Sequence, residues 1–387
     1  MTVRVQFVAA VVAVAVGFAT SLAAQADALS DARKLLSEGK FIEAEAALSA
    51  AVESPILAPE AYYTWYQSLR ARGEGERALR KLETAAKLAA DRADWWLELG
   101  LYSAELGRTD EAAAHYLTAL SIAPGFGQAH AALSGLLLDL GRTAEAEAQL
   151  REGLRADPRF AGNWVSLADL LLSQERPLDA LALLDQGMEA CPGNAPISIA
   201  RGRVYDTMGE FTRALEAYQQ AVSSDPANPA AHLFLGRALR ARGQLGPAMA
   251  SYRRAAALAT DDPEPWVEMA WLAVEDRKAP GAARQHSSKA LALAPEDCRA
   301  NAVHGWALVS SKQTEKGLEL ISKTVDAHPK CPDAAYAMAL AVARDGDKPQ
   351  AVVWLQQAAR EAKDPALQRR ASGLAKQLQA TEANAGQ

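Results

Sequence analysis

Residues 153–158 read GLRADP, and a phrase of the same kind returns along the chain. Each copy combines small and helix-favouring residues with a final proline, which cannot continue a helix and disfavours helical backbone at the residue before it. The phrase therefore predicts the end of a helix. The other copies are ALSIAP (119–124), GMEACP (187–192), AVSSDP (221–226) and ALALAP (290–295).

The spacing of these prolines indicates an internal repeat. Pro124, Pro158, Pro192 and Pro226 follow one another at intervals of 34 residues. Fixed periods of about 20 to 50 residues are typical of stacked repeat proteins. The predicted units begin at residues 25, 59, 93, 127, 161, 195, 229, 263, 298 and 332, and the unit from 263 carries one extra residue around KAPGAAR (278–284).

Within one unit, apolar and small residues show helical spacing twice. Gly107 separates the two runs of the unit from 93, where a left-handed helix cap is needed, so each unit is predicted to be a pair of helices. Small residues on the first helix predict close contact with the second helix. These are Gly100, Gly202, Gly236 and Gly305, expected to face Ala112, Ala214 and Ala248.

The pattern resembles the tetratricopeptide repeat, with W-x-x-L-G-x-x-Y in the first helix, A-x-x-x-Y/F-x-x-A in the second and a closing proline. Residues 198–226 match it at Gly202, Tyr205, Gly209, Ala214, Tyr218, Ala221 and Pro226, while Ser198 and Arg201 replace the tryptophan and leucine. The resemblance covers residues 25–365. It implies an all-α fold, a right-handed α-solenoid of about ten stacked helix hairpins.

The segment after Pro365 is predicted to be a capping helix. Leu367, Ala371, Leu374 and Leu378 share one helical stripe. We expect a solvating helix to about Ala380 and then a frayed end, within residues 366–387.

The N-terminal segment, residues 1–26, is typical of a secretory signal. Arg4 precedes an apolar run, and Ala24, Gln25 and Ala26 form an A-x-A cleavage site. Cleavage would leave the solenoid as residues 27–365. The alternative is a retained membrane anchor, because residues 5–24 approach the roughly 20 residues that span a bilayer. Either interpretation places the rest of the chain outside the cytoplasm, where disulfides persist, and the cleaved signal predicts a periplasmic or secreted protein.

Composition and motifs argue against several classes of function. The chain of 387 residues is 50% hydrophobic and 23% charged, as in globular proteins. A net charge of −6 argues against nucleic-acid binding, which needs clustered lysines and arginines. The six histidines lack zinc-site spacing, and no catalytic motif is present. We therefore expect no enzyme, cofactor, metal site or nucleic-acid partner, and a membrane only if the N-terminal segment is retained.

Two of the three cysteines are spaced for a possible disulfide. Cys298 and Cys331 are predicted to lie in the turns before two successive first helices. Neighbouring helices lie roughly 8 to 10 Å apart, whereas a disulfide needs Cα atoms within about 7 Å, so the turn geometry decides. A bridge and three unpaired thiols both remain open.

The resemblance implies that the first helices line an inner wall, where the second, fifth, ninth and twelfth residues of each unit meet a protein or peptide segment. This wall is predicted to be apolar at both ends and basic between them. For the leucines the alternative is burial between repeats, and for the arginines it is a solvated face paired with Asp206. The candidates are Leu101, Leu138, Leu172, Arg203, Arg237, Arg240, Trp271, Trp306, Tyr336 and Leu340.

Trp271 and Trp306 share the ninth position of consecutive units, which predicts that their rings lie one above the other. A partner covers them, the capping helix folds back on them, or they belong to the core. The leading hypothesis is a non-catalytic periplasmic or secreted scaffold that holds a partner segment. The rival hypothesis is a membrane-anchored assembly or export factor, for instance in cytochrome maturation or in polysaccharide or protein secretion.

Overall fold

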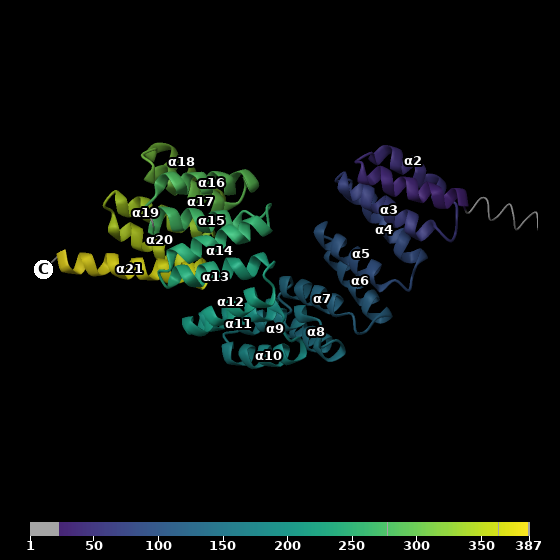
Figure 1. Cartoon of the computed structure of the whole chain (residues 1–387), viewed down its shortest axis with the longest axis horizontal. Helices are drawn as coiled ribbons and strands as arrows, with labels where there is room; N and C mark the ends of the chain where they lie inside the picture. Colours follow the sequence, from purple (N-terminus) through teal and green to yellow (C-terminus); the bar gives the residue numbers. More distant parts are fainter. Residues whose placement is uncertain (1–22, 277, 363, 386–387) are drawn as a thin grey trace, which may run out of the picture. The chain divides into compact units, whose positions relative to one another are not determined.

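A computed structural model describes residues 23–276, 278–362 and 364–385, with side chains up to Thr381. Every regular element of this described part is a helix (Figure 1), so the predicted all-α class is confirmed. Most of the predicted signal, residues 1–22, lies outside the described residues. Among the described helices, none combines the length and the apolar character that a membrane span requires.

The helices pair into consecutive hairpins. Residues 23–37 are helical and precede α2 (Phe41–Ala51). The following hairpins are α3 (Ala58–Ala71) with α4 (Gly75–Leu88), α5 (Ala93–Glu105) with α6 (Thr109–Ile122), α7 (Gly127–Asp139) with α8 (Thr143–Ala156), α9 (Ala161–Ser173) with α10 (Pro177–Ala190), and α11 (Ala195–Met208) with α12 (Phe211–Ser224).

The C-terminal hairpins complete the series. Where the structure describes the start of a first helix, that start lies within one residue of the predicted start of a unit. The remaining helices are α13 (Pro229–Ala241) with α14 (Leu245–Leu258), α15 (Glu264–Trp271) and its π-helical extension η1 (Leu272–Asp276) with α16 (Pro280–Leu293), α17 (Cys298–Ser310) with α18 (Thr314–Ala327), α19 (Pro332–Arg344) with α20 (Lys348–Glu361), and finally α21 (Pro365–Ala385).

Contacts divide the stack into two compact units, with a boundary inside α9. The N-terminal unit ends at Leu167, and the C-terminal unit begins at Ala168. Each unit is described by itself below.

The turn between the two helices of a hairpin needs left-handed backbone. Gly107 has a φ of 76°, which glycine adopts without steric cost. In three hairpins a residue with a side chain takes the same position: Glu175 (φ 59°), Lys278 (φ 53°) and Lys312 (φ 65°). The glycine pattern predicts most of these turns but misses these three.

The extra residue of the unit from 263 is absorbed in its first helix and the turn that follows. α15 continues into the π-helical turn η1, and the Ala279 N–H donates to the Ala273 carbonyl at 2.8 Å. A single inserted residue produces such a turn because each hydrogen bond then spans one more residue. The extra residue is therefore accommodated between Ala273 and Ala279. This segment ends at the beginning of the KAPGAAR stretch, around which the extra residue was predicted.

Glycines in the middle of the first helices permit close contact with the second helices, as predicted. A Cβ atom on Gly202 would lie 2.4 Å from Cε1 of Tyr218, and one on Gly236 would lie 2.5 Å from Cε1 of Tyr252. Both tyrosines are fully buried, so these two glycines make room for a ring rather than for the predicted alanine. At Gly100 an added Cβ would also lie 3.2 Å from the carbonyl oxygen of Ala112, the predicted partner.

Replacing Gly236 with Ala should destabilise the C-terminal unit by about 1–3 kcal/mol, the usual cost of overpacking, because the buried Tyr252 ring would have to move. Chemical denaturation followed by circular dichroism measures this change. Gly246→Ala in α14 is the matched control, since no atom lies within 4 Å of the added methyl group. Equal stability of the two variants would contradict this account of the helix crossing.

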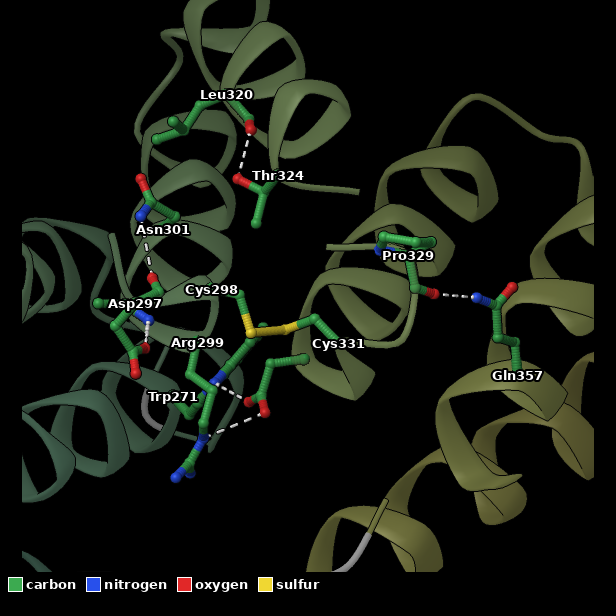
Figure 2. The surroundings of a disulfide bond; sticks show 12 residues. Trp271, Asp297, Cys298, Arg299, Asn301, Leu320, Thr324, Pro329, Cys331 and Gln357 are labelled. Carbon is green, nitrogen blue, oxygen red and sulfur yellow. Dashed lines mark hydrogen bonds and ion pairs between the residues drawn. A yellow bond between two sulfur atoms is a disulfide. The ribbon is translucent and has the colours of Figure 1, made fainter. Parts of the chain in front are cut away.

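Cys298 and Cys331 form a disulfide, with their Cα atoms 6.3 Å apart (Figure 2). Cys298 is the first residue of α17, and Cys331 is the residue that caps α19. Of the two alternatives that the sequence left open, the structure has the bridge. It joins the starts of two successive first helices around a segment that contains α17 and α18.

Reduction of this bridge should lower the stability of the C-terminal unit by about 3–4 kcal/mol, because the unfolded chain regains the freedom of a loop of some 33 residues. Hydrogen exchange should then accelerate in α17–α20 before it does in the N-terminal unit. Cys298→Ser in the presence and absence of reductant is the control, and it should show no further response to reductant. Labelling of three cysteines in the denatured, unreduced protein would show that the bridge does not form.

Candidate binding groove

The C-terminal helix α21 lies across the first helices of the C-terminal unit. Arg369 donates to the Asp206 carbonyl in α11 at 3.4 Å, and Arg370 donates to Glu275 in η1 at 2.9 Å. Leu374 shares a pocket with Trp306 of α17 and with Leu340 of α19. One helix therefore contacts the first helices of several hairpins, in addition to α20 beside it in sequence.

The apolar stripe predicted for this helix is its contact face. Leu367, Ala371 and Ala375 are buried, and Leu374 and Leu378 pack against the same hydrophobic cluster. The expected solvating cap is thus a helix that covers a surface formed by several repeats. We call that surface, made of α11, α13, α15, η1, α17 and α19, the C-terminal wall.

The three arginines of the predicted basic stretch are paired with carboxylates. The Arg203 guanidinium lies 2.8 Å from Asp169. Arg237, whose side chain is 11% exposed, lies 2.6 Å from Glu264 and also contacts Glu268 at 2.9 Å. Asp206, predicted as the partner of these arginines, accepts from the Tyr218 hydroxyl at 2.8 Å and lies 3.8 Å from Arg369 of α21.

Arg240, at 8% exposure, contacts Glu275 at 2.7 Å and Asp276 at 2.6 Å. Arg299 continues the network toward α19, where it lies 3.2 Å from Asp333. In this ion-pair network three arginines, Arg237, Arg240 and Arg299, thus face five carboxylates, which gives the network a formal charge of −2. The positive charge expected at Arg237 and Arg240 is therefore neutralised by carboxylates of the neighbouring first helices. The five carboxylates are Glu264, Glu268, Glu275, Asp276 and Asp333.

The pKa values of the carboxylates in this network are shifted in different directions. Burial by itself would raise the pKa of Glu268, but the charges of Arg237, Arg299 and Arg370 outweigh burial and lower the pKa to about 2. For Asp333 burial dominates over the attraction of Arg299, and its pKa is raised. Glu268 is therefore the carboxylate that depends most on its arginines.

The two tryptophans follow two of the alternatives that the sequence left open, burial in the core for Trp271 and contact with the capping helix for Trp306. Trp271 is fully buried, and its indole N–H donates to Asp333 at 3.0 Å. Its ring meets the edge of the Tyr336 ring, with 5.5 Å between the ring centres. Trp271 is therefore a core residue, and Tyr336 is also buried. Trp306 is half-buried and lines a pocket that Leu374 of α21 helps to form.

The N-terminal unit exposes leucines at the ninth and the twelfth position of two successive repeats. Leu101 is 45% exposed and Leu138 is 36% exposed. Between them in sequence lies Gly135 of α7, where an added Cβ would meet no atom within 4 Å. We call Leu101, Gly135 and Leu138 the N-terminal wall. Leu172, the third predicted leucine, is half-buried and belongs to the C-terminal unit.

Ligands for a metal are not gathered anywhere in the described ranges: no group of three histidine, cysteine, aspartate or glutamate side chains is suitably arranged. His130 illustrates the role of the histidines. It is buried, with its Nδ1 3.2 Å from Gln149 and its Nε2 3.0 Å from the Pro124 carbonyl. Its two nitrogens contribute to packing between α7 and the neighbouring segments.

Acid should weaken the C-terminal unit through Glu268. Because the folded pKa of about 2 lies below the ordinary value of 4.5, the carboxylate stabilises the fold fully above pH 4.5 and loses this effect as the pH falls toward 2. The loss should be on the order of 3 kcal/mol. Glu268→Gln should be less stable than the natural protein at pH 7, with a flatter pH profile in urea denaturation. Glu315→Gln, at an exposed site on α18, is the control, and parallel profiles for all three proteins would refute the prediction.

Family profiles described as tetratricopeptide repeat match residues 63–125, 199–263 and 302–366, and a second one matches residues 103–170. No curated protein sequence matches the chain. Among solved structures, the APC/C hetero-tetramer Cut9–Hcn1 aligns with a TM-score of 0.51 and 16% identity, over 92% of this chain and 84% of that chain. IFIT1 with Gppp-AAAA gives 0.50 and 13%, over 87% and 90%. Yeast Tom70 gives 0.45 and 12%, over 93% and 96%.

Because these identities are low, the matches to Cut9–Hcn1 and IFIT1 show a shared fold and nothing beyond it. The profiles together cover more than half of the chain, and they coincide with the helix hairpins of the structure. Tetratricopeptide repeats are typically non-catalytic scaffolds that bind protein segments. This chain belongs to the tetratricopeptide-repeat family.

Proposed function

We propose that this chain is a non-catalytic scaffold, exported to the periplasm or secreted, which holds a segment of a partner protein against the first helices of its repeats. The observation that carries the proposal is the position of α21, because the C-terminal wall already holds a helix in this way. In the part of the chain that the structure describes, Leu101 and Leu138 of the N-terminal wall stand at such first-helix positions and remain exposed.

The chemistry of the N-terminal wall suits an apolar ligand. Burial of apolar surface contributes roughly 25 cal/mol per Å², so two exposed leucines on one wall favour a partner that covers them. Gly135 leaves space for the partner's backbone to approach α7. The Arg70–Glu105 ion pair at 2.8 Å and the Tyr63–Glu98 hydrogen bond at 2.6 Å add polar groups to the first helices nearby.

The proposed location rests on the sequence of residues 1–26 and is supported by the Cys298–Cys331 disulfide, since disulfides persist mainly outside the cytoplasm. N-terminal sequencing of the protein from cells should give Asp27 as the first residue. A protein that begins at Met1 and fractionates with membranes would favour the anchored assembly or export factor instead.

Capture of the partner tests the proposed site. A photo-crosslinking amino acid at Leu138 should trap a defined protein in intact cells, whereas the same group at Leu117 on the second helix α6, which is also exposed, should not. Gly135→Arg should reduce the trapped product at least tenfold, since the new side chain fills the open wall without a clash. Gly281→Arg in α16, where an added Cβ likewise meets no atom, is the matched control.

The outcomes separate clearly. Equal trapping by Gly135→Arg and Gly281→Arg, or equal trapping from Leu117 and Leu138, would remove the N-terminal wall as the binding site. Circular dichroism of each variant confirms that the helices are retained.

A further inference from the structure

α21 contacts the C-terminal wall through one short segment. The buried residues are Leu367, Ala371 and Ala375, while Lys376 and Gln377 are exposed. Gly373 lies between the buried positions, and an added Cβ there would meet no atom. Because a glycine inside a helix costs about 1 kcal/mol relative to alanine, α21 is a helix of modest intrinsic stability. Its contact face consists of these buried residues together with Leu374 and Leu378, which pack against the same hydrophobic cluster.

Two adjacent arginines give this segment its polar contacts. The Arg369 guanidinium lies over the Phe211 ring at 4.4 Å and 3.8 Å from the Asp206 carboxylate. The Arg370 guanidinium lies 5.6 Å from the centre of the Tyr336 ring and donates to Glu275 at 2.9 Å. The same oxygen of Glu275 accepts from Arg240 of the wall at 2.7 Å. α21 therefore inserts a cation into a network that belongs to the wall.

The charge of the wall explains why a cation is accepted there. In the network of Arg237, Arg240 and Arg299 with five carboxylates, Arg370 offsets part of an acidic excess beside the largely buried Glu275 and Arg240. Asp364, just before α21, contributes one carboxylate of its own, 3.8 Å from Arg237. Charge-assisted contacts of arginine with buried carboxylates are specific because they need a fixed geometry. An acidic segment would add to the excess charge, whereas an arginine-bearing segment reduces it.

We propose that the C-terminal wall is a binding site for an amphipathic helix of a partner protein that carries two adjacent arginines beside an apolar stripe, and that α21 occupies this site in cis until such a helix displaces it. The required pattern is that of LQRRASGL (367–374). The inference rests on the proposed function only in that it also assigns ligand binding to the first helices. The partner thus takes over the contacts of Leu367, Arg369, Arg370 and Leu374.

A labelled peptide with the sequence of residues 364–381 is the probe, and the full chain is the receptor. The natural chain should bind it weakly, because α21 competes at the high effective concentration of an attached ligand. Arg370→Glu places a carboxylate against Glu275 and should expel α21, so that the peptide binds this variant at least tenfold more tightly. Fluorescence anisotropy measures both affinities. A peptide carrying Arg370→Glu should bind neither protein.

Two further variants show whether a change in peptide affinity comes from the release of α21. Lys376→Glu makes the same charge change at an exposed position of α21 and should behave as the natural chain. Ala371→Glu should release α21 by bulk and charge at a fully buried position, without any change to the wall. It should bind the peptide as Arg370→Glu does.

Hydrogen exchange decides the outcome. The proposal is overturned if α21 is released in both variants without a gain in peptide affinity, if α21 is released in neither, or if α15 and α17 lose protection together with α21. None of these results depends on the partner trapped through Leu138, so the function proposed for the N-terminal wall stands or falls separately.

Discussion

The C-terminal unit depends on a buried carboxylate that is paired with arginines. Glu268 of α15 is 3% exposed and lies among arginines of the preceding and following first helices, Arg237 of α13 and Arg299 of α17. A buried charge that loses its partner destabilises a protein by several kcal/mol, so these helices are constrained to keep their spacing. Arg299 then extends the same constraint to Asp333 of α19. One ion-pair network therefore connects the first helices of four successive hairpins. In our proposal, the negative charge of this network favours a ligand that carries arginines.

The helices were largely predictable from the sequence because their signals are local. Prolines end the second helices, glycines make most of the turns, and the period of 34 residues fixes the register. The π-helical turn was not predictable from the same signals. If positions are counted back from the residue that caps the second helix of each unit, Glu275 is equivalent to Arg240. If they are counted forward from the start of the unit, the residue equivalent to Arg240 is Val274. One inserted residue thus places the carboxylate of Glu275, and not the Val274 side chain, at the position equivalent to Arg240.

The site was only partly predictable for a different reason. The predicted arginines do lie on the first helices, as expected. Their positive charge alone does not indicate the charge of a ligand, because residues one repeat unit away in sequence can neutralise it. Asp169 and Arg203 are 34 residues apart, and so are Arg299 and Asp333. Opposite charges at the period of the repeat were therefore the missing signal. Trp271 could not be placed by such counting, because its burial depends on Tyr336 and Asp333 two units further along.

The Cys298–Cys331 disulfide and the Arg299–Asp333 ion pair both connect the start of α17 with the start of α19. Cys298 precedes Arg299, Cys331 lies two residues before Asp333, and Arg299 and Trp271 lie beside the bridge in Figure 2. A covalent link between the starts of α17 and α19 limits how far these helices separate when α21 leaves. Because a preformed site loses less free energy in ordering when it binds, such a brace favours exchange of one helix for another over collapse of the wall. An oxidising compartment would then supply the condition under which the C-terminal wall keeps its shape without its own helix.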